Sequence, residues 1–124
     1  FMLAVSYNPG YQSILKDLKP STRQRFVALS FDYPGPEQEA EIVMRESGID
    51  QEMAILLIKL GRMTRALKES GLSEGASTRL LIQTGKLITL GIPVHEACRA
   101  SITEALTDDP ELLGAIDEMV SSLF

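Results

Sequence analysis

The sequence has few of the cysteines that cross-link small secreted domains and no excess of the basic residues that attract nucleic acid. Its 124 residues include one cysteine, no tryptophan, three tyrosines and four phenylalanines, and 17 acidic residues outnumber 12 basic ones. The single Cys98 excludes an internal disulfide and agrees with a reducing cytoplasm. A net charge of −5 gives no general attraction for nucleic acid or for an anionic membrane. No apolar run approaches the roughly 20 residues of a transmembrane helix.

Two motifs of nucleotide binding are also missing. No G-x-x-x-x-G-K-[ST] loop occurs, so the sequence lacks the backbone cradle that holds phosphates in P-loop proteins. No apolar run ends in paired acidic residues that could hold Mg²⁺. The sequence starts at Phe1, directly in an apolar run, and we therefore expect it to be part of a longer protein.

The N-terminal part contains two short apolar runs, residues 2–6 and residues 26–32. Runs of this length between turn residues are typical of buried strands, and their helix-sized connection fits a β-α-β crossover. Ligands bind beyond the carboxyl ends of such strands, and Asn8 stands at the first of these ends. Its amide can both donate and accept hydrogen bonds, although an Asn before Pro9 also forms ordinary Asx turns.

After a turn at residues 33–36 the pattern is helical to the end of the sequence. Apolar residues recur every three or four positions, as on the buried face of a helix. The predicted helix starts are Pro36, Asp50, Ser77, Pro93 and Asp109, and the predicted stops are Gly48, Gly71 and Gly91. We predict a mainly α fold, with a two-strand remnant of an α/β core in residues 1–35, a connecting helix in 36–49 and a four-helix bundle in 50–124.

Three arginines are candidates for binding phosphate. Arg79 falls in the first turn of the helix capped by Ser77, where a cation opposes the helix dipole but free N–H groups attract an anion. Arg23 and Arg25 precede the second apolar run, and an arginine can stabilise the charge of a phosphoryl group during transfer. The alternatives are an ion pair of Arg79 with Glu74 or another acid, and a solvated basic turn around Arg23 and Arg25 that holds an acidic partner.

Other polar residues point to no chemistry of their own. Basic residues recur every three positions along one predicted helix: Lys59, Arg62, Arg65 and Lys68. This basic stripe could bind an acidic partner, but such a pattern is more often the solvated face of an amphipathic helix. Cys98 falls on an apolar stripe and is expected in the core. His95 has no second His or Cys at ligand spacing, so no metal site is predicted.

Three segments together resemble AAA+ ATPases of the MoxR group, in particular the CbbQ/NirQ/NorQ branch. The segment A-V-S-Y-N-P at residues 4–9 is similar to the strand that ends in the sensor-1 asparagine. The segment S-T-R-Q-R-F at residues 21–26 is similar to the one that carries the arginine finger. The segment G-A-S-T-R at residues 75–79 looks like the sensor-2 signature of the lid, and the resemblance covers essentially the whole chain.

The resemblance implies a role for each candidate residue. Asn8 would orient the attacking water as sensor 1. Arg25, with Arg23 as the second choice, would reach the nucleotide of a neighbouring subunit as the finger. Arg79 would touch the γ-phosphate of the nucleotide bound in its own subunit.

It also implies cofactors and partners. The cofactors would be ATP and Mg²⁺, with most ligands outside this sequence, so the chain alone is expected to be inactive. The partners would be other copies in a ring, expected to be a hexamer, a von Willebrand A-type protein and a client enzyme such as Rubisco or nitric oxide reductase. The alternative function is a non-enzymatic helical interaction module, and a helical DNA-binding domain is a more distant one because of the acidic net charge.

Overall fold

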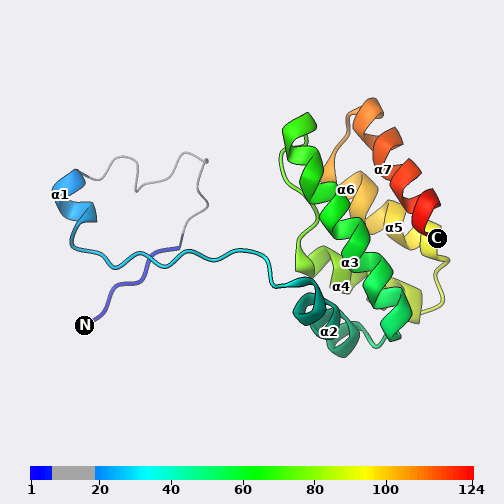
Figure 1. The fold of residues 1–124 in the computed structure, drawn as a ribbon, viewed down its shortest axis with the longest axis horizontal. Coiled ribbons are helices and arrows are strands. Elements are labelled where there is room, and N and C mark those ends of the chain that lie inside the picture. The colour runs from blue at the N-terminus through cyan, green and yellow to red at the C-terminus, as the bar shows by residue number, and fades with distance from the viewer. Residues whose placement is uncertain (7–18) are drawn as a thin grey trace. The chain divides into compact units, whose positions relative to one another are not determined.

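The computed structural model describes residues 1–6 and 19–124. The chain divides into two compact units, Phe1–Asp32 and Tyr33–Phe124. Figure 1 shows that the second unit is built of helices, and the described residues contain no strand. Within the same residues, no helix is both long enough and apolar enough to cross a membrane. The prediction of a mainly α protein is confirmed.

The first unit contains one short helix among its described residues, α1 (Pro20–Arg23). The prediction of strands at residues 2–6 and 26–32 is wrong, since neither segment forms a strand. A strand needs a neighbour whose backbone groups pair with its own, and an apolar run by itself supplies none. Consistent with this, the side chains of Val27 and Phe31 are exposed.

The second unit contains six α-helices and two short irregular turns of helix. The α-helices are α2 (Pro36–Ser47), α3 (Gln51–Ala66), α4 (Thr78–Thr89), α5 (Val94–Cys98), α6 (Glu104–Leu106) and α7 (Pro110–Leu123). A 3₁₀ turn, η2 (Leu67–Ser70), follows α3, and a π turn, η3 (Arg99–Thr103), joins α5 to α6. The four helices predicted after residue 50 therefore correspond to α3, α4, the run α5–η3–α6, and α7.

The predicted helix boundaries follow from local capping. The side chain of Asp50 accepts a hydrogen bond from the backbone N–H of Met53 at 2.8 Å, and Ser77 accepts one from Leu80 at 3.3 Å. Asp109 caps α7 in the same way. Such caps contribute about 1 kcal/mol each. Positive φ angles occur at the three glycines predicted as stops: Gly48, Gly71 and Gly91.

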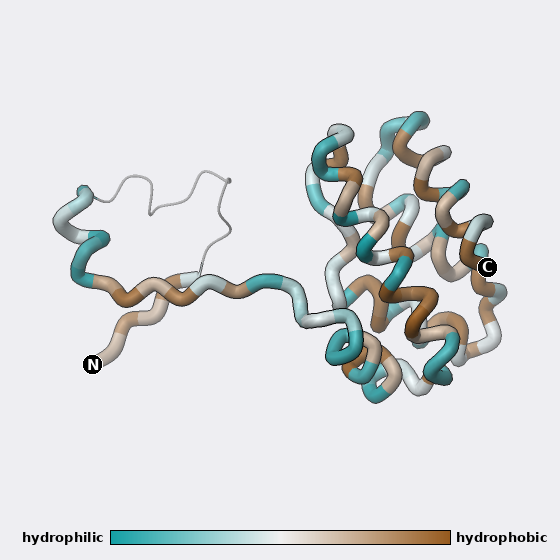
Figure 2. Tube along the Cα trace, viewed as in Figure 1, coloured by the Kyte–Doolittle hydropathy of each residue, from teal (hydrophilic) through white to brown (hydrophobic). Residues whose placement is uncertain are grey.

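The core of the second unit draws on all its long helices. Figure 2 shows hydrophobic and hydrophilic residues interspersed along them, as expected of amphipathic helices. The fully buried large apolar residues are Val43, Leu57, Leu60, Leu81, Ile102 and Ile116. Helix α2 packs against both α3 and α4, so the segment predicted as a connecting helix belongs to this compact unit. A Cβ on Gly85 of α4 would lie 2.5 Å from Ser47 Oγ, which shows how closely α2 and α4 approach.

Candidate functional site

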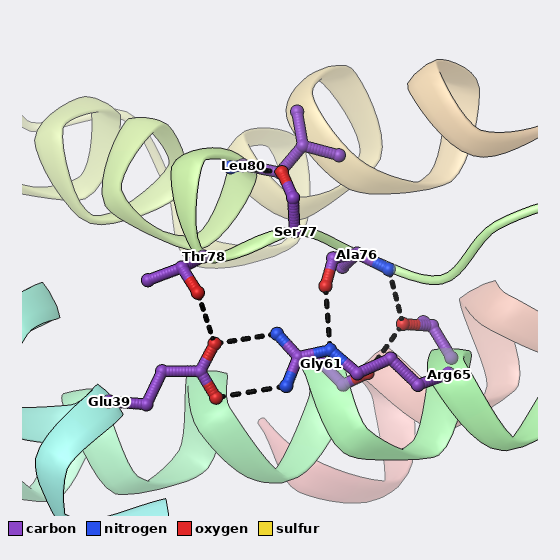
Figure 3. A network of polar contacts seen from close by, with 8 residues as sticks. Glu39, Gly61, Arg65, Ala76, Ser77, Thr78 and Leu80 are labelled. Atoms are coloured by element: carbon purple, nitrogen blue, oxygen red, sulfur yellow. Dashed lines mark hydrogen bonds and ion pairs between the residues drawn. The ribbon is translucent and has the colours of Figure 1, made fainter. Parts of the chain in front are cut away.

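A buried carboxylate lies in the first turn of α2. Glu39 is 0% exposed, and its two oxygens accept hydrogen bonds from the guanidinium of Arg65 in α3 (Figure 3). The distances are 2.6 Å from Nη2 to Oε1 and 2.9 Å from Nη1 to Oε2. Thr78, the first residue of α4, donates its hydroxyl to Oε1 at 2.7 Å. A buried charge needs such partners, and the planar guanidinium matches both oxygens at once.

Arg65 also contacts two segments outside the helices. Its Nε donates to the backbone carbonyl of Ala76, just before α4, at 2.8 Å. Its guanidinium carbon lies 3.7 Å from the centre of the Tyr33 ring, at the start of the second unit. Only 12% of the Arg65 side chain is exposed. A forked, planar cation can make all these contacts together, whereas a lysine ammonium cannot.

The loop before α4 is held by further contacts with α3. Thr64 accepts a hydrogen bond from the backbone N–H of Ala76 at 3.0 Å and donates its hydroxyl to the Gly61 carbonyl at 2.7 Å. A Cβ on Gly75 would collide with the backbone of Arg65, so the loop lies directly on α3. Both backbone groups of Ala76 are thus bonded, and the position at which α4 begins is fixed.

The network keeps Glu39 ionised. Burial opposes ionisation of the carboxyl, but hydrogen bonds from Arg65 and Thr78 and the charges of Arg65 and Arg62 outweigh it. The pKa of Glu39 therefore lies below its ordinary value of 4.5. At neutral pH Thr78, at the start of α4, therefore donates its hydrogen bond to an ionised carboxylate.

Arg79 directly follows Thr78 and is exposed in the first turn of α4. Within the described part of the chain it makes no hydrogen bond and no ion pair, and the alternative pairing with Glu74 does not form. A cation at a helix N-terminus gains nothing from the dipole, while the backbone N–H groups beside it attract anions. The arrangement therefore presents a guanidinium with no partner among the described residues beside a positive helix end.

The other predicted site residues belong to the first unit. Arg23 is the last residue of α1, Arg25 follows two residues later, and both are exposed. Asn8 lies outside the described residues. Arg79 belongs to the second unit. The roles of all four candidates stay predictions.

The prediction of a solvated basic stripe is wrong at Arg65. Lys59 and Arg62 are exposed, but Arg65 points inward to Glu39. A signal for the pair was present in the sequence. Glu39 precedes the core residue Val43 by one turn, and Arg65 follows Gly61 by one turn, so each charge falls on a buried helix face.

Two further predictions concern potential ligands of metals. Cys98 lies in the core as predicted, and burial raises its pKa to about 12. His95 is exposed in the first turn of α5. Among residues 1–6 and 19–124 there is no group of three or more His, Cys, Asp or Glu side chains that could hold a metal ion.

Comparison with known proteins identifies the class and then the family. Residues 39–123 match the family model described as CbbQ/NirQ/NorQ C-terminal, a range that begins at Glu39 and includes Arg65, Thr78 and Arg79. The helical unit is thus that of a MoxR-type protein. Within this class the chain belongs to the CbbQ/NirQ/NorQ family, and the resemblance deduced from its motifs is confirmed.

Three relatives illustrate how much of such a protein the chain covers. The denitrification regulatory protein NirQ of Pseudomonas aeruginosa is 54% identical over 120 residues, which are 97% of this chain. Protein CbbQ of Hydrogenophilus thermoluteolus and protein NorQ of Paracoccus denitrificans are 51% and 48% identical over 124 residues, the whole of this chain. The aligned part is 46% of each relative, so the chain spans about half their length.

Proposed function

We propose that the chain is the C-terminal part of an AAA+ ATPase and that Arg79 is its nucleotide sensor. The observation that carries the proposal is the exposed Arg79 guanidinium, without an ion-pair partner in the described residues, at a helix start held by the hydrogen bonds of Ala76 and Thr78. Its charge opposes the helix dipole at a cost of about 0.3–1 kcal/mol. A phosphate that binds there relieves this cost and gains forked hydrogen bonds.

The proposal assigns the remaining chemistry to the first unit and to sequence beyond this chain. Arg25, with Arg23 as the alternative, reaches the nucleotide of a neighbouring subunit and stabilises the transferring phosphoryl group. Their exposure in the first unit is compatible with this role. Asn8 orients the attacking water. The phosphate loop and the Mg²⁺ ligands come from sequence beyond residues 1–124, so ATP and Mg²⁺ bind only to the longer protein.

The full protein acts as a cytoplasmic ring, a hexamer in this proposal, that remodels, activates or matures a client enzyme. ATP hydrolysis moves the helical unit through Arg79, and a partner with a von Willebrand A-type domain connects this movement to the client. Nitric oxide reductase and Rubisco are the client types considered. A relative named as a denitrification regulatory protein supports the first. The alternative is a non-enzymatic module that uses either the basic stripe or another exposed helix face. Its first possible surface is reduced, since Arg65 lies in the interior.

The test is ATP turnover by the full-length protein. We expect Arg79→Ala and Arg25→Ala each to reduce turnover strongly, by about 10³-fold or more for an arginine finger. Lys86→Ala is the matched control, because Lys86 is an exposed cation on the same helix as Arg79 but in its last turn. Normal turnover by Arg79→Ala would contradict the proposal.

Mixed rings distinguish a finger acting between subunits from one acting within a subunit. A ring formed from Arg25→Ala and Arg79→Ala subunits contains interfaces in which one subunit supplies an intact finger and the other an intact sensor. With random mixing these are about one quarter of the head-to-tail interfaces. We expect the mixture to regain turnover that neither variant has alone. No recovery in a properly assembled mixed ring would exclude the inter-subunit role of Arg25.

A further inference from the structure

We propose that Arg65 is a positioning residue for Arg79 and that it links the start of the second unit to the start of α4. The inference rests on the proposed function, because it concerns how Arg79 is presented to phosphate. Arg65 does not touch the nucleotide in this proposal. It fixes the helix end from which Arg79 projects.

The contacts around the start of α4 converge on Arg65 (Figure 3). Its Nε holds the carbonyl of Ala76, and its two Nη atoms hold Glu39, which in turn accepts the hydroxyl of Thr78. Ala76 and Thr78 flank the capping residue Ser77, and Thr78 is the neighbour of Arg79. One side chain therefore sets the backbone on both sides of the cap, directly before the proposed sensor.

The same side chain carries a contact with the beginning of the unit. Tyr33 is the first residue of the second unit, and its ring stacks on the Arg65 guanidinium. The preceding residue, Asp32, ends the unit that holds Arg25. A displacement of the chain at Tyr33 therefore acts on Arg65 directly, and through it on the start of α4. This gives the helical unit a route by which movement at its entry point changes the presentation of Arg79.

The competing explanation is that Arg65 only stabilises the fold. A purely stabilising residue would lower the melting temperature when changed, and its effect on catalysis would be independent of Arg79. A positioning residue acts through Arg79, so its effect on the affinity for ATP disappears once Arg79 is gone. The two explanations therefore differ in a double-mutant cycle.

The first measurement compares Arg65→Lys with wild type in the full-length protein. Lysine keeps the charge but loses the forked contacts and the flat surface that stacks on Tyr33. We expect the KM for ATP to rise about tenfold, because small misplacements of a positioned group have effects of this order or larger. Lys59→Ala, an exposed cation on the same helix, is the control and should leave KM unchanged. An unchanged KM in a folded Arg65→Lys protein would overturn the inference.

The second measurement repeats Arg65→Lys in the Arg79→Ala background. Because Arg79→Ala is expected to lose turnover, the Kd for ATP is measured by direct binding in wild type, both single variants and the double variant. We expect the double variant to have the same Kd as Arg79→Ala, and an effect of Arg65→Lys that multiplies with that of Arg79→Ala would overturn the inference while leaving the proposed function intact. Normal turnover by Arg79→Ala alone would instead refute the proposed function, and the inference with it. If melting curves show that Arg65→Lys does not fold, Thr78→Val decides the question. It removes one hydroxyl and spares the ion pair, so a raised KM supports the inference and an unchanged KM overturns it.

Discussion

The substitution Glu39→Gln tests how the buried network holds the helical unit together. Glutamine keeps the shape of the side chain but removes the charge and turns one acceptor oxygen into an NH₂ donor. The bond of 2.6 Å or the bond of 2.9 Å from Arg65 is then replaced by two donors facing each other. Removing one partner of a buried ion pair lowers the free energy of unfolding by about 3–5 kcal/mol.

The remaining contacts of Arg65 reduce that figure. Its guanidinium keeps the Ala76 carbonyl and the Tyr33 ring, and 12% of the side chain is exposed to water. We therefore expect Glu39→Gln to lower the free energy of unfolding by about 2–4 kcal/mol. This is a large part of the stability of a small domain, which is about 5–15 kcal/mol in total.

The assay is urea unfolding of the 124-residue chain at pH 7, followed by circular dichroism. Glu37→Gln is the control, since Glu37 is exposed in the same turn of α2 and should change stability by no more than about 0.5 kcal/mol. In an Arg65→Ala background, Glu39→Gln should lose most of its effect. A loss below about 1 kcal/mol in the otherwise unchanged chain would refute the reasoning, because it would mean that the pair is not desolvated.

The remaining predictions concern pH, packing and reactivity. Because the folded-state pKa of Glu39 lies below 4.5, its contribution to stability is present above pH 4.5 and is lost as the pH falls through that folded-state pKa. Urea titrations should therefore show that the difference in free energy of unfolding between wild type and Glu39→Gln decreases only below pH 4.5. Gly85→Ala should destabilise by about 1–3 kcal/mol in the same assay, because its Cβ would lie 2.5 Å from a Ser47 oxygen. Gly114→Ala, with open space around the new Cβ, should instead stabilise α7 by about 0.5–1 kcal/mol. The buried Cys98 thiol, with its pKa raised to about 12, should react with iodoacetamide at pH 8 only after unfolding, as mass spectrometry would show.

Helices could be predicted from the sequence because their signals are local. A capping side chain such as Asp50 bonds a backbone group three residues away. Gly48, with its left-handed backbone, ends α2 through a bond to the carbonyl of Met44, four residues earlier. The π turn at Arg99–Thr103 has no such local signal, so one helix was expected where three segments occur. The prediction of two strands was wrong because strand formation is not a local property. Their formation depends on partner strands remote in sequence, and an apolar run of strand length gives no information about these.

The candidate site likewise contains one feature that local sequence predicts and one that it does not. The place of Arg79 in the first turn of α4 follows from Ser77 and from residue spacing, both local. The Glu39–Arg65 pair joins residues 26 positions apart and depends on how α2 packs on α3 and α4. Spacing alone could show that each charge lies on a buried face. It could not show that the two faces meet.

Stability alone does not explain why an ion pair occupies this position. Two apolar side chains of similar volume would hold α2 against α3 as well as a buried ion pair does, or better. They would leave the Ala76 carbonyl and the Thr78 hydroxyl without their partners, and the start of α4 would keep only its packing and the bond from the Ala76 N–H to Thr64. The charged pair therefore adds a defined geometry, since hydrogen bonds fix distances and angles that apolar contacts leave variable. That geometry is imposed on the backbone immediately before Arg79. The phosphate-binding role that we propose for Arg79 requires it at this position most, because forked hydrogen bonds to phosphate depend on placement.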